Sequence, residues 1–243
     1  MSETQATHTQ DVQTTDRRIA WSVLDVVLAV VTGTGIGIVL GGISGALLLG
    51  GSGVSDSVMF LVIGTFIYGG IALMSWLLVV KRRSVPIEAT GLNKAGPGPI
   101  LLMIPLTLGV LIMNFIVSLL TATLFGDVPT AEDQLALGSS TLTIVDLVCL
   151  LIVGAILAPL VEEFVFRGLL YRAIRSRSGI GAATLITALS FALVHFTPLL
   201  IGVFFFFGII LAMVAERFDS LYPPIVLHAL NNTVAIGLVY LAQ

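Results

Sequence analysis

Apolar segments long enough to cross a membrane recur from Trp21 to the C-terminal end of this 243-residue chain. A membrane-spanning helix needs roughly 20 mostly apolar residues, because lipid offers no hydrogen-bond partners to its backbone. Only 10% of the residues are charged and 57% are hydrophobic, which lies outside the range of soluble globular domains. The sequence therefore predicts an all-α, polytopic membrane helix bundle of about seven transmembrane helices.

The predicted bundle covers residues 21–243 and follows a polar N-terminal tail, residues 1–20, which we expect to be disordered and cytoplasmic. In the first apolar segment, small residues recur at every fourth position: Gly33, Gly37, Gly41 and Gly45. Such a stripe lets the backbone of a second helix approach closely. We therefore expect close helix packing along this face of the first span.

Charge predicts the orientation of the bundle. With the N-terminus inside, every basic residue falls on the cytoplasmic side: Arg17, Arg18, Lys81, Arg82, Arg83, Lys94, Arg167, Arg172, Arg175, Arg177 and Arg217. The charged residues of the outer connections are all acidic: Asp56, Asp127, Glu132 and Asp133. Because cytoplasmic loops are enriched in Lys and Arg, we predict an N-in, C-out protein of the cell membrane. The sequence shows no basic patch for nucleic acid.

Two adjacent carboxylates and an arginine interrupt an apolar segment: Glu162, Glu163 and Arg167. A charge in hydrocarbon costs about 2.5–3.5 kcal/mol on insertion scales, so such residues usually face a bundle interior or an aqueous cavity. Glu163 and Arg167 are four positions apart and can form an ion pair on one helix. Glu162 points about 100° away and is free to face a cavity. The ion pair alone also has a purely structural interpretation, as neutralisation of a buried charge.

Two histidines and an asparagine reach a similar predicted depth. Counted along their helices, Glu162 and His195 lie roughly 15–20 Å from the charged end, and His228 and Asn232 lie roughly 8 and 13 Å from it. A lone buried histidine is usually a hydrogen-bonded core residue. Four polar groups at matching depth instead indicate a common site in the membrane.

These residues form three short motifs: Glu162-Glu163-x-x-x-Arg167, Phe191-x-x-x-His195 and His228-x-x-x-Asn232. Together and in this order they resemble the motifs of the CPBP family of intramembrane endopeptidases, the Abi or CAAX-protease group that includes the Rce1-type prenyl-protein peptidases. The resemblance covers about residues 142–241, and residues 1–98 carry no signal of the family.

The resemblance implies a glutamate-dependent peptidase. It implies that Glu162 is the general base that activates water and that His195 holds this water. His228 and Asn232 would then donate hydrogen bonds to the oxyanion, with Glu163 and Arg167 as supporting residues. It implies no cofactor. Zinc is the alternative, with Glu162, His195 and His228 as ligands, but the chain lacks the His-Glu-x-x-His arrangement of zincins.

The resemblance does not identify a substrate. The short loops and the absence of a soluble domain instead favour a membrane-associated protein, either a CAAX-like prenylated chain or an amphipathic peptide. The partners are thus the lipid bilayer and this substrate, and the oligomeric state stays open. Two other classes of function are alternatives. One is a non-catalytic immunity or binding protein of the same fold, and the other is a proton-coupled transporter, because acids and histidines in a bundle also relay protons.

Overall fold

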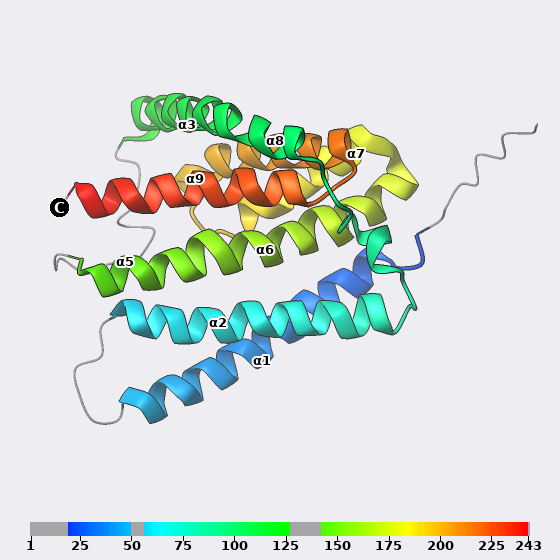
Figure 1. Ribbon diagram of the computed structural model, residues 1–243, viewed down its shortest axis with the longest axis horizontal. Helices are drawn as coiled ribbons and strands as arrows, with labels where there is room; N and C mark the ends of the chain where they lie inside the picture. The colour runs from blue at the N-terminus through cyan, green and yellow to red at the C-terminus, as the bar shows by residue number, and fades with distance from the viewer. Residues whose placement is uncertain (1–18, 50–55, 127–141, 243) are drawn as a thin grey trace, which may run out of the picture.

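The computed structural model describes residues 19–49, 56–126 and 142–242, and every element in these ranges is a helix (Figure 1). The first half contains α1 (Val23–Leu49), α2 (Asp56–Ser75), η1 (Trp76–Lys81), η2 (Ile87–Thr90) and α3 (Pro97–Phe125). The second half contains α5 (Ile144–Leu150), η3 (Leu151–Leu157), α6 (Ala158–Glu163), η4 (Phe164–Tyr171), α7 (Arg172–Leu193), η5 (Pro198–Leu200), α8 (Ile201–Phe218) and α9 (Tyr222–Leu241). Of the predicted tail, residues 1–18 lie outside the described residues.

Six helices of the described chain are long and apolar enough to cross a membrane. One of them, Ile144–Leu193, has 50 residues and is too long for a single crossing. Its direction reverses at Gly179, where φ is 78° and ψ is 176°, a conformation that glycine adopts without a steric penalty. The expected all-α, multi-pass bundle is therefore confirmed, with one long helix folded back on itself. The predicted N-in orientation stays a prediction.

The glycine stripe of α1 packs directly against α2. A Cβ atom added at Gly33 would lie 2.6 Å from the carbonyl oxygen of Gly70, and one at Gly37 would lie 2.5 Å from that of Phe66. Real Cβ atoms do not approach other atoms so closely, so a side chain at either position would push the helices apart. The expected close packing is thus present, and α2 is the helix that fills the stripe.

One continuous helical rod, formed by α5, η3, α6, η4 and the start of α7, carries both glutamates. Two of its stretches, η3 and η4, are π-helical and flank the six-residue α6. Pro159 contributes to the first of these, because proline cannot donate a hydrogen bond to the preceding turn and its ring crowds the carbonyl there. Widened π-helical turns are frequent at functional sites.

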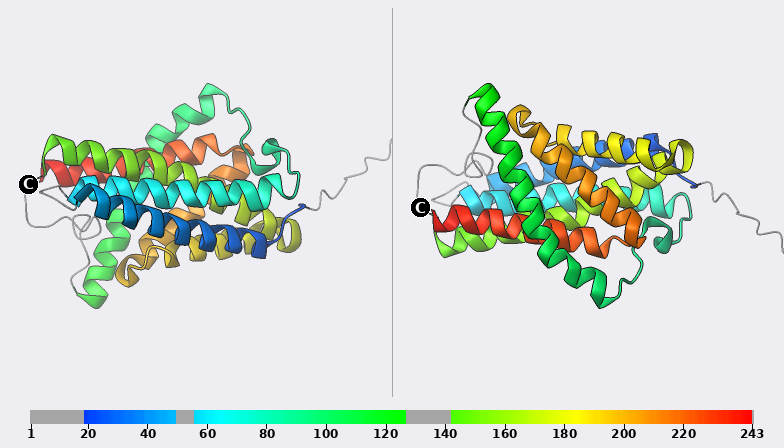
Figure 2. Two further views of the ribbon diagram at one scale, coloured as in Figure 1. Left: turned by 90° about the horizontal axis from the view of Figure 1, so that it is seen from below. Right: turned by 90° about the horizontal axis from the view of Figure 1, so that it is seen from above.

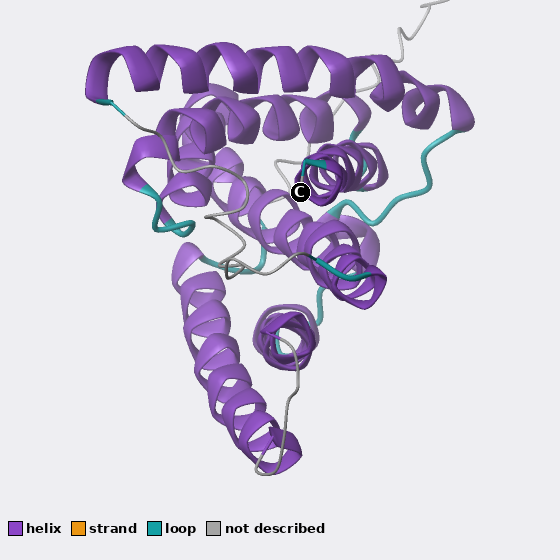
Figure 3. Cartoon of the chain, turned by 90° about the vertical axis from the view of Figure 1, so that its left-hand side faces the viewer, coloured by secondary structure: helices purple, strands orange, loops and turns teal. Residues whose placement is uncertain are grey.

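The third long helix, α3, lies across the bundle rather than along it. Figure 2 (right) shows it crossing over its neighbours, and Figure 3, viewed from the C-terminal end, shows it at the top, perpendicular to helices seen end-on. Its main contacts are with α8 and α9, whereas α2 packs on α5, η3 and α6. The glutamate-bearing rod is therefore covered by α2 on one side and by α9 on another.

Charged side chains gather at the end of the bundle where α1 begins and α8 ends. Three ion pairs lie there: Arg83–Asp25 at 2.7 Å, Arg172–Asp219 at 2.8 Å and Arg175–Glu216 at 2.6 Å. The buried indole of Trp21 donates a hydrogen bond to the Leu169 carbonyl at 3.0 Å and ties the start of α1 to η4. This end corresponds to the predicted cytoplasmic side.

Candidate active site

The two adjacent glutamates have different surroundings. The Glu163 side chain is completely buried, and its ion pair with the equally buried Arg167 measures 2.8 Å between Oε1 and NH1. The Glu162 side chain keeps 17% of its surface exposed. The i, i+4 ion pair expected from the sequence is therefore present, and Glu162 is the carboxylate that a second molecule can reach.

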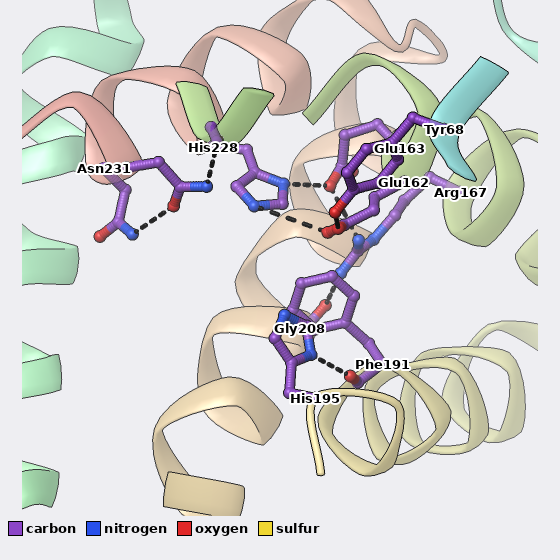
Figure 4. Close-up of polar contacts among 11 residues, drawn as sticks. Tyr68, Glu162, Glu163, Arg167, Phe191, His195, Gly208, His228 and Asn231 are labelled. Carbon is purple, nitrogen blue, oxygen red and sulfur yellow. Dashed lines mark hydrogen bonds and ion pairs between the residues drawn. The ribbon is translucent and has the colours of Figure 1, made fainter. Parts of the chain in front are cut away.

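Glu163 joins three helices through its ion pair. His228 on α9 places Nδ1 2.8 Å from the Glu163 Oε1 atom (Figure 4). Arg167 also donates from NH2 to the carbonyl of Gly208 on α8, at 3.1 Å, and its guanidinium lies 4.6 Å from the centre of the Phe191 ring. Burial of a charge is tolerated where it is both paired and hydrogen-bonded. Oε1 of Glu163 and both terminal nitrogens of Arg167 meet this condition, whereas Glu163 Oε2 and Arg167 Nε have no hydrogen-bond partner among the described residues.

Glu162 contacts helices on both sides of the rod. Its Oε1 atom accepts a hydrogen bond from the Tyr68 hydroxyl of α2 at 2.8 Å, and its Oε2 atom lies 3.9 Å from His228 Nε2 (Figure 4). A distance of 3.9 Å is too long for a direct hydrogen bond. One oxygen of the carboxylate is therefore held, and the other faces a histidine across a short gap.

Tyr68 was not among the residues expected from the sequence. It lies in the part of the chain without a family motif, and its partner is 94 positions away. The available signal was a tyrosine hydroxyl within a largely apolar span, because a buried tyrosine usually finds a hydrogen-bond partner. That signal does not identify the partner.

His195 lies directly after the last turn of α7 and is held by aromatic rings. Its Nδ1 atom is 2.7 Å from the Phe191 carbonyl oxygen, and its ring stacks on Phe204 with centroids 4.0 Å apart. Because a carbonyl only accepts, Nδ1 carries the proton and Nε2 is left as the acceptor of the neutral ring. The Phe191 ring also makes edge contacts with both histidines, at 4.7 Å from His195 and 5.8 Å from His228.

Asn232 is held at the other edge of the site. Its side-chain amide donates to the Gly154 carbonyl of η3 at 2.8 Å, one turn along α9 from His228. Two further amides extend this contact: Asn231 donates to Asn232 Oδ1 at 3.2 Å, and Asn114 of α3 donates to Asn231 Oδ1 at 3.1 Å. The structure thus brings Glu162 and His228 together and holds His195 and Asn232 nearby through contacts of their own.

A polar cavity of about 760 Å³ opens at the charged end of the bundle. Arg167 is part of its lining, together with the ion-paired residues of α7 and α8, whereas Glu162 and His195 are not. The cavity therefore borders Arg167 and does not include the Glu162 carboxylate.

The zinc alternative requires Glu162, His195 and His228 to converge. Within the described ranges, no three His, Cys, Asp or Glu side chains are grouped as metal ligands. Both histidines use Nδ1 for another contact, His228 with Glu163 and His195 with the Phe191 carbonyl, and such a second contact is also usual for a metal ligand. What speaks against a preformed three-ligand site is therefore only that the three described side chains do not converge, and no chemical step below passes through a metal.

Comparison with known proteins places the site within one family. The model of the family described as type II CAAX prenyl endopeptidase Rce1-like matches residues 144–234. No curated protein and no solved structure matches the chain. The matched stretch contains all three motifs, with Glu162, Glu163, Arg167, His195, His228 and Asn232. Residues 144–234 are thus similar to the Rce1-like family of CAAX prenyl endopeptidases, and this match supports the family that the motifs predict.

Proposed function

We propose that this protein is an intramembrane endopeptidase in which Glu162 activates the water that hydrolyses the peptide bond. The observation that carries the proposal is the asymmetry of this carboxylate. Its Oε1 atom is bound by Tyr68, whereas Oε2 is free of direct hydrogen bonds from described residues and faces His228 at 3.9 Å. A general base needs a carboxylate oxygen that can accept a hydrogen bond from a water molecule, and the arrangement supports Oε2 as this oxygen.

His195 completes the binding of water in this proposal. Since its Nδ1 proton is used by the Phe191 carbonyl, the Nε2 lone pair can accept a hydrogen bond from water. Glu162 then takes the proton as the water oxygen attacks the carbonyl carbon of the substrate. The same glutamic acid afterwards protonates the amine that leaves, so that the base is restored.

His228 serves as a donor to the oxyanion. Because its Nδ1 atom donates to Glu163, its Nε2 atom can donate only when the ring carries both protons. An imidazolium at His228 and the guanidinium of Arg167 carry two positive charges. These balance the two negative charges of the Glu162 and Glu163 carboxylates. A preorganised donor of this kind is typically worth about 2.7–4 kcal/mol in the transition state.

Asn232 is the second donor in the proposal. One proton of its amide is used by the Gly154 carbonyl, and the second proton is available to the substrate oxygen. The hydrogen bond from Asn231 fixes the oxygen end of the Asn232 amide and so keeps the nitrogen end in place.

The substrate we propose is a prenylated or amphipathic protein tail that enters from the membrane. The family description names CAAX prenyl endopeptidases, and the site lies among helices whose outer faces carry large apolar side chains. A lipid-modified segment can partition into the same layer as the site, which raises its local concentration there.

Cleavage of a quenched, prenylated peptide library by the purified protein in lipid nanodiscs tests this function. We expect Glu162→Gln to lower kcat by about 10²–10⁴-fold, the usual contribution of a general base, with little loss of stability. Glu88→Gln, the same change on the 3₁₀ turn η2, is the matched control and should retain activity. A folded wild-type protein that cleaves no peptide, or a Glu162→Gln variant with full activity, would overturn the proposal and favour the non-catalytic alternative.

A further inference from the structure

We propose that Tyr68 is a positioning residue for the base: it fixes Oε1 of Glu162 so that Oε2 is the oxygen that takes the proton from water. This inference rests on the proposed function. It adds Tyr68 of α2, which lies outside the matched region at 144–234, to the residues of the proposed active site.

The contact itself is a well-formed hydrogen bond. The hydroxyl of Tyr68 lies 2.8 Å from Glu162 Oε1, the most frequent distance for O–H···O bonds. The terminal torsion of a glutamate side chain is soft and two-fold, so its two oxygens exchange places easily when nothing holds them. A single donor on one oxygen removes this equivalence. The held oxygen points toward α2, and the other is left toward His228.

The packing of α2 brings the hydroxyl to this place. Gly64 lies one turn before Tyr68, and a Cβ atom added there would lie 2.7 Å from Cγ1 of Val153 in η3. The missing side chain therefore lets α2 approach the glutamate-bearing rod closely. With α2 at this distance, the tyrosine ring spans the remaining gap to Glu162.

Tyr68→Phe removes only the hydroxyl and keeps the ring, which makes it the sharpest test. We expect kcat to fall about tenfold to a hundredfold, the cost of a misplaced catalytic group, while KM stays within about twofold. Tyr171→Phe is the matched control, because the Tyr171 hydroxyl also bonds a glutamate, Glu216, at 3.1 Å near the charged end. We expect its kcat to equal that of the wild type. An unchanged kcat in Tyr68→Phe, or a rise in KM alone, would refute the positioning role.

A second measurement follows the contact without peptide cleavage. The apolar reagent dicyclohexylcarbodiimide adds to carboxyl groups inside membranes, and mass spectrometry locates the adduct. We expect Glu162 to be modified severalfold faster in Tyr68→Phe than in the wild type or in Tyr171→Phe, because the hydroxyl no longer covers Oε1. Glu162→Gln should show no adduct at this position. Equal rates in all proteins that keep Glu162 would contradict the inference.

The two measurements separate this inference from the proposed function. If the wild type cleaves no peptide but Tyr68→Phe speeds the labelling of Glu162, the peptidase proposal fails and the contact stands, without its catalytic role. If cleavage depends on Glu162 but Tyr68→Phe changes neither kcat nor labelling, the peptidase proposal stands and Tyr68 has no part in it.

Discussion

Arg167 and His228 bind the same oxygen atom of Glu163: the NH1 atom of the arginine and the Nδ1 atom of the histidine each lie 2.8 Å from Oε1. One buried carboxylate thus connects an ion pair that stabilises the fold to the imidazole that faces Glu162. A change at Glu163 should therefore affect both the stability of the protein and its chemistry.

Glu163→Gln should destabilise the protein strongly, because it leaves the fully buried Arg167 without a counter-charge. Loss of one partner from a buried pair costs about 3–5 kcal/mol. Titration with a denaturing detergent in mixed micelles measures the free energy of unfolding. Glu216→Gln is the control, since the Arg175–Glu216 pair is partly exposed and should be worth about 0–1 kcal/mol. Equal losses in the two variants would contradict the proposed importance of burial.

Asn232→Ala should lower kcat with little effect on KM, because it removes a donor needed mainly in the transition state. Loss of one such donor costs about 10²–10³-fold in kcat. Asn231→Ala should have a smaller effect, because Asn231 only orients its neighbour. Steady-state cleavage of the best library peptide gives both constants. A larger loss in Asn231→Ala than in Asn232→Ala would reverse these assigned roles.

Gly37→Ala should weaken the packing of α1 on α2, since the added methyl group would overlap the backbone of α2. Overpacking of this kind costs about 1–3 kcal/mol. Gly35→Ala is the matched control, because no atom lies within 4 Å of a Cβ atom placed there. Its higher helix propensity should leave stability unchanged or raise it by up to about 1 kcal/mol. Thermal unfolding of both variants in the same detergent compares them, and a Gly37→Ala variant as stable as Gly35→Ala would disprove the close contact.

Removal of metal ions should leave peptide cleavage unchanged if Glu162 acts without a metal. The test is kcat/KM before and after treatment with a chelator, with a zinc peptidase in the same nanodiscs as a positive control for chelation. Activity that disappears with chelator and returns with zinc would instead support the alternative in which Glu162, His195 and His228 are ligands.

The helices and their packing stripe could be predicted from sequence because the bilayer imposes them. Apolar length predicts the spans, and the spacing of Gly33 and Gly37 predicts a close neighbour. The pattern does not identify α2 as that neighbour. It also does not predict that α3 lies across the bundle, because this depends on contacts with α8 and α9 that are distant in sequence.

The candidate site was predictable only where its contacts are local. The Glu163–Arg167 pair follows from a spacing of four residues on one helix. The Tyr68–Glu162 and Asn114–Asn231 contacts join residues 94 and 117 positions apart, and no local pattern reports them. The Asn232 amide faces the Gly154 carbonyl within a π-helical turn, whose geometry departs from the regular helix that the spacing assumes.

The contribution of α2 to Glu162 sets a minimum size for any engineered version of this protein. A graft of residues 144–234 onto foreign helices would transfer every motif residue and still lack the Tyr68 hydroxyl that binds Glu162. A chimera would need at least Gly64 and Tyr68 in register with the transplanted rod. The first helical hairpin is then more than a membrane anchor, and selection on peptide cleavage should act on its residues as well as on the motifs.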